Sequence, residues 1–257
     1  GARSANDVAI LFDWDAWWGC ELDSHPSIDI TYRDQAEAFH AAFTDLGVGV
    51  DVVPPQADLS NYRLVVVPTL YTLSPETAAR LSAAAEQATV LVTYFSGIVD
   101  ADDHIITGGY PGLLRDLLGI RVEEFLPLRE GESVQLDDAS AADVWAEIVT
   151  VDSADVVARF ADGPAAGGPA LTRRTTEAGQ AWYLATRLAA DALRALCRRL
   201  IDESGVVPIA EGIPGVEFVR RIAADGRHWT FVINHTDTEI CPNLVGVDLL
   251  TGQSGSR

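Results

Sequence analysis

The hydrophobic pattern within Tyr62–Asp100 predicts one complete β-α-β unit. Two apolar, β-branched runs, Leu64–Val67 and Val90–Thr93, flank a stretch in which alanine and leucine return every three or four residues. Neither run alternates apolar with polar residues, so both faces of each strand should be covered, as in a parallel sheet. Ser74 followed by Pro75 gives the intervening helix a clear start. A right-handed crossover between two parallel strands follows from this order.

The pattern continues as α/β on both sides of this unit. Between Ile120 and Phe160 it is less regular, with strand-like pieces at Ser133–Leu136 and Val156–Phe160. Together the elements predict an α/β fold, flavodoxin-like in outline, in which helices flank a mostly parallel sheet. The other elements expected are strands at Asp7–Phe12, Val48–Val53, Ala170–Thr175 and Gln180–Thr186, and helices at Tyr32–Leu46, Pro111–Leu118 and Ala189–Asp202.

Towards the end of the chain the pattern changes to strands that alternate apolar and polar residues. Val216–Ala223 and His228–Thr236 are joined through an Asp-Gly pair at 225–226, which is typical of two-residue hairpin turns. We therefore place an α/β domain at residues 1–208 and a small all-β domain at 209–257. A domain this short is expected to be incomplete or to depend on the first for its stability.

Charge and cysteine content exclude several classes of function. The formal net charge is -20, and an acidic surface repels nucleic acid and anionic membranes, so we expect neither as a partner. The chain has no lysine, which excludes Schiff-base chemistry and the lysine of a phosphate-binding P-loop. The chain has three cysteines in unrelated sequence contexts. An odd number without a common spacing indicates reduced thiols, as in cytosolic proteins, and not a set of disulfides. With no signal peptide or membrane span in the pattern, we expect a cytoplasmic protein without a cofactor.

Trp14, Trp17 and Trp18 fall within Asp13–Glu21, which we expect to form an aromatic and acidic loop at the carboxyl edge of the sheet. Open α/β sheets bind ligands at this edge. Three indoles so close together can stack on sugar rings or anchor a protein interface. They can also fold onto their own sheet, because Trp is mostly buried in proteins. These three residues are the candidates for contact with a substrate or a subunit interface.

Ser96 and His104 are the candidates for catalysis by the chain itself. Ser96 follows a buried strand and precedes Gly97, as the nucleophile does in many α/β hydrolases, and His104 could act as its base. The full G-x-S-x-G motif is absent, because Tyr94 takes the place of its first glycine. A structural turn is the favoured interpretation of this segment.

Asp100, Asp102 and His104 have a spacing that can ligate a divalent metal if the segment is extended. A turn rich in aspartate gives the same pattern, and no second ligand cluster accompanies it in the sequence. We therefore expect no metal site.

Several stretches together resemble the non-catalytic part of a glycoside hydrolase family 42 β-galactosidase. The likeness covers nearly the whole chain in one order, so it is more specific than any single motif. The stretches that carry it are Val8–Trp18, Leu46–Pro68, Val92–Asp103, Gly108–Phe125, Val216–Ile222, Phe231–Thr236 and Leu249–Gly252.

The resemblance implies a parent enzyme in three parts. These are a catalytic (β/α)8 barrel, a flavodoxin-like or class I glutamine amidotransferase-like α/β domain used for trimerisation, and a small C-terminal β domain. The two catalytic glutamates of the family lie on the barrel, so no position here inherits them and the chain is expected to be inactive alone. Amidotransferases carry a cysteine near the position of Ser96, and this chain has none there.

The primary hypothesis is accordingly a homotrimerisation module that helps to wall the β-galactoside site of a neighbouring barrel. Two alternatives remain open. One is a stand-alone serine hydrolase or amidotransferase-like enzyme that uses Ser96 and His104. The other is a galactoside-binding module that acts through Trp14, Trp17 and Trp18.

Overall fold

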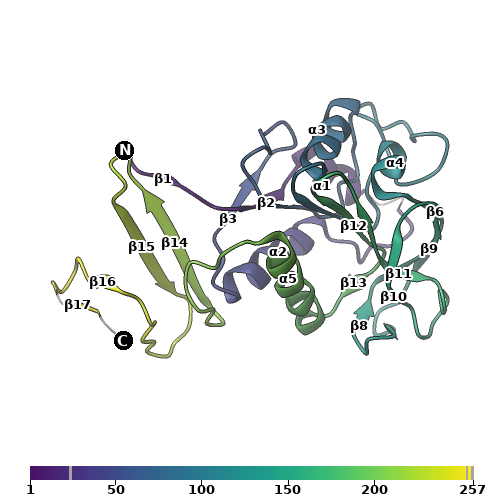
Figure 1. Cartoon of the computed structure of the whole chain (residues 1–257). Coiled ribbons are helices and arrows are strands. Elements are labelled where there is room, and N and C mark those ends of the chain that lie inside the picture. The colour runs from purple at the N-terminus through teal and green to yellow at the C-terminus, as the bar shows by residue number, and fades with distance from the viewer. Residues whose placement is uncertain (23–24, 253, 256–257) are drawn as a thin grey trace.

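The computed structural model describes residues 1–22, 25–252 and 254–255. Figure 1 shows a larger α/β body and, to one side of it, a small sheet that contains the first strand, with the C-terminal segments beside it. None of the helices in the described ranges is long and apolar enough to cross a membrane.

A seven-stranded mixed sheet with the order β10-β11-β12-β5-β4-β2-β3 forms the centre of the body. The strands from β12 to β3 run parallel to one another, whereas β11 pairs antiparallel with β12, and β10 pairs antiparallel with β11. β2, β4 and β5 are buried along their whole length, so both faces of the sheet are covered at its centre. The predicted mixture of helices and sheet is confirmed. The strands are β2 (Val8–Leu11), β3 (Val50–Val53), β4 (Leu64–Val67), β5 (Thr89–Thr93), β10 (Asp155–Arg159), β11 (Pro169–Thr175) and β12 (Gln180–Leu184).

Helices cover both faces of this sheet. α2 (Tyr32–Asp45) and α5 (Ala190–Ser204) pack against each other on one face, and α3 (Pro75–Ala85) lies on the other (Figure 1). The predicted start of α3 is confirmed, because the Ser74 hydroxyl accepts a hydrogen bond from the Thr77 N–H at 3.2 Å. β4, α3 and β5 thus form the predicted β-α-β unit. Two short helices follow β5: η1 (Gly112–Leu114) and α4 (Arg115–Leu118).

The region expected to be irregular, Ile120–Phe160, supplies all but one strand, β13, of two small antiparallel sheets. One pairs β6 with β9, and the other has the order β13-β8-β7. A bulge between Val122 and Glu124 interrupts the pairing of β6, so its apolar and polar residues do not alternate cleanly. This explains why the sequence gives no clear strand signal there. The strands are β6 (Ile120–Pro127), β7 (Ser133–Gln135), β8 (Ala141–Asp143), β9 (Trp145–Val151) and β13 (Arg187–Leu188).

The small sheet has the order β1-β14-β15, so the first strand joins the predicted C-terminal hairpin, although its residues were assigned to the first domain. This sheet leans on the end of α2, where the Asp45 carboxylate accepts a hydrogen bond from the Gly215 N–H at 2.9 Å. Gly47, with φ +75°, permits this close approach, since a Cβ there would lie 2.2 Å from the Ala210 carbonyl oxygen. The strands of this part are β1 (Arg3–Ser4), β14 (Val216–Ile222), β15 (His228–Asn234), β16 (Gly246–Val247) and β17 (Ser254–Gly255).

Glu147 on β9 is a fully buried carboxyl group that ties three segments together. One of its oxygens, Oε1, accepts hydrogen bonds from Trp145 Nε1 at 2.9 Å and from the Phe95 N–H at 3.1 Å. The other, Oε2, accepts from the Tyr183 hydroxyl of β12 at 2.6 Å. Burial raises the pKa of Glu147 to about 7, and the three hydrogen bonds, led by that from Tyr183, only partly offset this rise. The group therefore links β9 to the main sheet and to the turn after β5.

This raised pKa predicts a fall in stability as pH increases. Between the ordinary pKa of 4.5 and about 7, the folded chain keeps a proton that the unfolded chain has lost. The stabilisation by this proton is therefore complete below pH 4.5 and lost once the pH reaches about 7. The free energy of unfolding should fall by about 3 kcal/mol over this range. Glu147→Gln, which has no proton to lose, should remove this part of the pH dependence in urea unfolding.

Glu124→Gln is the matched control, because it removes an exposed glutamate from the neighbouring strand. Its pH profile of stability should follow that of the unmodified chain. Parallel profiles for the Glu147 variant and the unmodified chain between pH 4.5 and 7 would contradict the raised pKa.

Candidate functional site

The indole segment is a helix, α1 (Trp14–Cys20), and not the predicted loop. Its N-cap is Asp13, whose side chain accepts a hydrogen bond from the Asp15 N–H at 3.3 Å. The negative charge of Asp15 also favours the N-terminal end of a helix. The Asp13 N–H donates to the Tyr32 hydroxyl at 2.8 Å, which ties the start of α1 to α2. Seven residues are too few to show a helical repeat of apolar positions, so the sequence gives no helix signal here.

The three indoles lie together but differ in exposure. Trp17 is partly buried against Phe12, with the ring centroids 5.7 Å apart, whereas Trp14 and Trp18 are 57% and 63% exposed. The Trp14 ring lies 5.2 Å from that of Trp17 and 6.1 Å from that of Trp18. Trp17 thus anchors the cluster to the core, and the rings of Trp14 and Trp18 form an exposed apolar area, which we call the indole surface.

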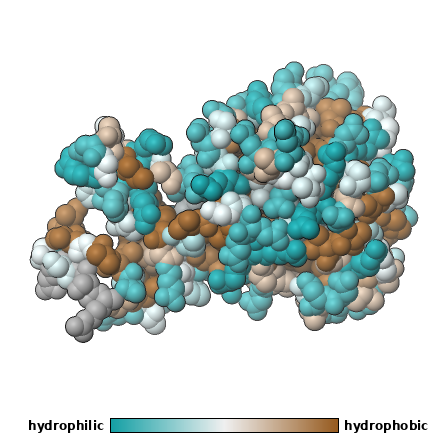
Figure 2. Space-filling view, in the orientation of Figure 1, coloured by the Kyte–Doolittle hydropathy of each residue, from teal (hydrophilic) through white to brown (hydrophobic). Residues whose placement is uncertain are grey.

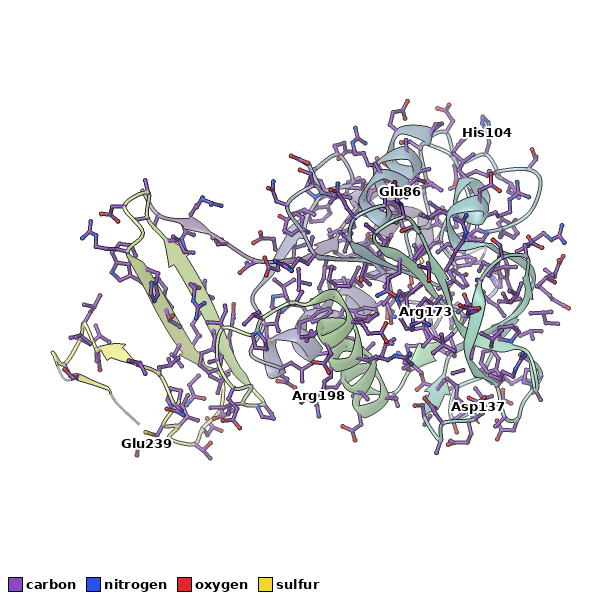
Figure 3. All side chains as sticks on the ribbon, viewed as in Figure 1. Glu86, His104, Asp137, Arg173, Arg198 and Glu239 are labelled. Carbon is purple, nitrogen blue, oxygen red and sulfur yellow. The ribbon has the colours of Figure 1, made fainter. Side chains whose placement is uncertain are left out.

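The Ser96 hydroxyl closes the turn after β5. It donates to the Thr93 carbonyl oxygen at 2.7 Å and accepts from the Leu70 N–H at 2.9 Å, and the residue is only 1% exposed. His104 projects from the surface of the body, where its ring faces the Asp100 carboxylate at 3.6 Å (Figure 3). In the described part of the chain, the two predicted catalytic residues therefore have separate partners, and no hydrogen bond joins them.

Asp100, Asp102 and His104 do come together, with one potential ligand atom from each lying within 4.8 Å of the others. The Asp100 carboxylate accepts hydrogen bonds from the backbone N–H groups of His104 at 3.0 Å and Asp102 at 2.9 Å. These two bonds, that from His104 first, lower the pKa of Asp100. They are the contacts of an aspartate-rich turn, which accounts for the cluster without a metal ion. The absence of a metal site stays a prediction.

Packed aromatic rings occupy the carboxyl edge of the sheet, where the sequence predicts a ligand. Phe95 has φ +54°, and its ring lies 5.1 Å from that of Trp145 and 5.4 Å from those of Tyr71 and Phe125. Its N–H is held by Glu147, a residue that the sequence analysis does not single out. The one available signal was a lone glutamate inside the apolar run of β9. In the described residues, the carboxyl edge of the sheet therefore presents packed aromatic rings, and Ser96 and His104 are not paired there as nucleophile and base.

Sequence comparisons relate almost the whole chain to β-galactosidases. The chain is 48% identical over 254 residues to a β-galactosidase from Arthrobacter sp, an alignment that covers 98% of this chain and 37% of the relative. It is 35% identical over 248 residues to β-galactosidase BgaB of Geobacillus sp. (strain Y412MC61), covering 95% of this chain and again 37% of the relative. The chain thus spans little more than a third of the length of these curated relatives.

Solved structures give the same result at the level of the fold. A crystal structure of β-galactosidase from Bacillus circulans sp. alkalophilus matches with a TM-score of 0.95 and 32% identity, over 99% of this chain and 40% of that chain. Gan42B, described as a GH42 β-galactosidase, matches with a TM-score of 0.89 and 27% identity, over 96% of this chain and 37% of that chain.

The family match lies over the α/β body. The family described as "Beta-galactosidase trimerisation domain" matches residues 6–207, which extend from the start of β2 to the end of α5 and its connection. The predicted resemblance to the non-catalytic part of a GH42 β-galactosidase is thereby confirmed. This chain belongs to the family of β-galactosidase trimerisation domains.

Proposed function

We propose that this chain is the assembly module of a longer β-galactosidase, in which it forms a homotrimer and helps to wall the β-galactoside site of a neighbouring catalytic barrel. The observation that carries this proposal is the family membership of residues 6–207. The alignment leaves most of the length of the Arthrobacter relative, 63%, for other parts, because it covers 37% of that protein. The catalytic glutamates belong to the barrel in this proposal, and the chain alone is inactive.

The order of the parallel strands supports a flavodoxin-like classification. Numbered by their order in the chain, β3-β2-β4-β5-β12 correspond to 2-1-3-4-5, the order of flavodoxin-like sheets. At the turn after β5, the left-handed position is held by Phe95, which carries no nucleophilic group. Both features support a non-catalytic domain. A cytoplasmic location is supported by three free cysteines, two of them buried.

We assign the indole surface to the contact between subunits. Exposed aromatic side chains are the residues that contribute most to protein interfaces, and Trp14 and Trp18 are both more than half exposed. The segment after α1 carries two further exposed apolar side chains, Leu22 and Ile28, which are 50% and 87% exposed. Exposed apolar side chains that gather in one area, as the indoles do, are typical of an interaction site.

We further propose that residues 209–257 form a separate small domain that the rest of the enzyme completes. Figure 2 shows apolar side chains on the surface of this part of the molecule. Phe231 and Ile233 of β15 are 54% and 42% exposed, and Leu249 and Leu250 beyond it are 74% and 98% exposed. So short a sheet buries little apolar surface by itself, which supports its dependence on other parts of the protein.

Replacing both Trp14 and Trp18 by alanine should weaken assembly. Each exposed aromatic anchor contributes roughly 2 kcal/mol to an interface, so the dissociation constant should rise by about thirtyfold for each anchor lost. Sedimentation equilibrium over a wide concentration range measures this change. Phe231→Ala is the matched control, because Phe231 is 54% exposed but lies on the small sheet.

An unchanged dissociation constant in the Trp14→Ala, Trp18→Ala double variant would remove the interface assignment. If the same substitutions in the longer enzyme instead raised KM for a galactoside with assembly intact, the indoles would contact substrate and not a subunit. Equal weakening in the Phe231→Ala control would show that the effect is not specific to the indole surface.

Ser96 has a structural role in this proposal. Ser96→Ala should lower the free energy of unfolding by about 1 to 3 kcal/mol, because the buried Leu70 N–H loses its acceptor. Urea unfolding measures this loss. An organophosphate probe should leave the unmodified chain unlabelled, since the Ser96 hydroxyl is buried and already paired. Covalent labelling of Ser96 would contradict the structural role and support the hydrolase alternative.

A further inference from the structure

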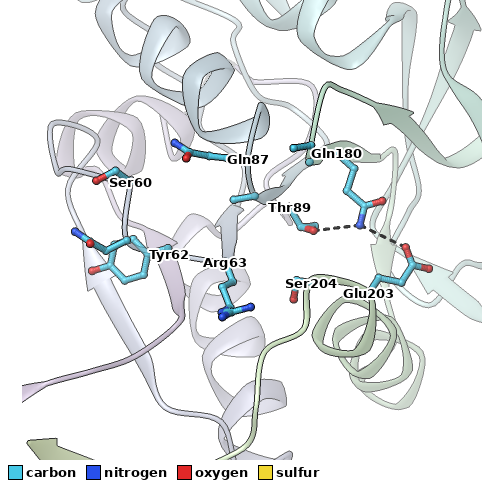
Figure 4. A pocket seen from close by; sticks show the side chains of 12 residues that line it. Ser60, Tyr62, Arg63, Gln87, Thr89, Gln180, Glu203 and Ser204 are labelled. Carbon is cyan, nitrogen blue, oxygen red and sulfur yellow. Dashed lines mark hydrogen bonds between the residues drawn. The ribbon is translucent and has the colours of Figure 1, made fainter.

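A hollow of about 500 Å³ lies at the amino ends of β4, β5 and β12, the edge opposite the packed aromatic rings (Figure 4). The loops that enter these three strands and the last turn of α5 surround it. Its volume is in the range of small-molecule sites. Its lining differs from most such sites, because polar side chains dominate, and the apolar contribution comes from Ala88, Ala178, Gly179 and the ring of Tyr62.

One side of the hollow is held rigid by a hydrogen-bonded set of side chains. The Gln180 amide nitrogen donates to Thr89 Oγ1 at 3.1 Å and to Glu203 Oε2 at 3.5 Å, as Figure 4 shows. The Glu203 carboxylate is also held by Arg199 at 2.8 Å and by Arg173 at 3.5 Å. The Gln180 amide and the Glu203 carboxylate are thus fixed before any ligand arrives.

The guanidinium groups behind this side are themselves anchored. Arg199 and Arg173 lie over the ring of Trp182, 5.0 and 5.5 Å from its centroid, and Trp182 is fully buried in β12. Two guanidinium groups therefore neutralise the single carboxylate of Glu203. This leaves Glu203 as a hydrogen-bond acceptor with little remaining attraction for a cation.

The opposite side of the hollow carries unpaired donors and acceptors. Asn61 and Gln87 are exposed residues that line the hollow, and neither side chain has a hydrogen-bond partner among the described residues. The Arg63 guanidinium has only a loose ion pair with Asp7, at 3.7 Å. Each amide supplies both a donor and an acceptor, and the guanidinium supplies a planar set of donors.

The balance of charge and polarity selects the class of ligand. An anion would meet only Arg63, which Asp7 partly neutralises, in a chain of net charge -20. A cation would meet a carboxylate that two guanidinium groups already occupy. An apolar ligand would find too little apolar lining. Neighbouring hydroxyl groups of a ligand, by contrast, can each donate and accept a hydrogen bond. They can therefore bond to the amides, the carboxylate and the guanidinium group that line the hollow.

We propose that this hollow binds a neutral, hydroxyl-rich molecule of the size of a mono- or disaccharide. The fixed Gln180 and Glu203 groups accept from its hydroxyls on one side, and Asn61, Gln87 and Arg63 bond to it on the other. The site lies at the opposite edge of the sheet from the indole surface.

Saturation-transfer NMR on the full chain, with lactose as the probe, tests this proposal. Saturable transfer to lactose is expected in the unmodified chain and in the Trp14→Ala, Trp18→Ala double variant. Asn61→Ala and Gln87→Ala should each weaken binding by about fivefold, through the loss of one or two hydrogen bonds. Gln135→Ala, which removes an exposed glutamine from β7, is the matched control and should bind lactose as the unmodified chain does.

No saturable transfer at any lactose concentration in the tens of millimolar range would overturn the site. Binding that survives in the Asn61→Ala, Gln87→Ala double variant but disappears in the Trp14→Ala, Trp18→Ala double variant would overturn it as well, and would place the sugar on the indole surface. The oligomeric state of each variant is measured separately, so failure of the sugar site and failure of the assembly proposal are distinguishable.

Discussion

The turn after β5 is the constraint on which the carboxyl edge of the sheet depends. It carries a left-handed, non-glycine residue, Phe95, and such a backbone costs on the order of 1 to 3 kcal/mol unless its surroundings hold it. Two buried side chains do so: the Ser96 hydroxyl joins Thr93 to Leu70, and the Glu147 carboxylate accepts from the Phe95 N–H. Because Glu147 also bonds to β12 and β9, the turn, the main sheet and the small β6–β9 pair form one connected core.

The two edges of the sheet differ from those of most open α/β sheets, because the aromatic rings close the edge that usually binds ligands. The carboxyl edge, where such sheets commonly bind ligands, is filled by aromatic rings and presents the indoles of α1 to the outside. The amino edge holds an open polar hollow instead. A fold that supports catalysis in other proteins here offers contact surfaces, which agrees with membership of a trimerisation-domain family.

The sequence predicts an element well where the residues that stabilise it are neighbours in the chain, and poorly where they are far apart. The sequence predicts β4 and β5 from their valine runs, because strands buried on both faces are apolar at every position. It predicts the start of α3 from Ser74 and Pro75, because helix capping acts between neighbouring residues. The α1 helix could not be predicted, since its seven residues are too few to show a helical repeat and its start is tied to Tyr32, which is not adjacent in the sequence. Glu147 could not be predicted as a link because its partners come from three separate strands and turns.

The measurement that tests the central claim most directly is the solution mass of this chain, by light scattering on a sizing column over a wide range of concentrations. The account predicts a mass of three protomers of 27.6 kDa at concentrations above the dissociation constant. That result would show that the trimerisation domain and its small sheet suffice for assembly. A mass of one protomer at every concentration would contradict the account, because the indole surface alone would then not hold the subunits together.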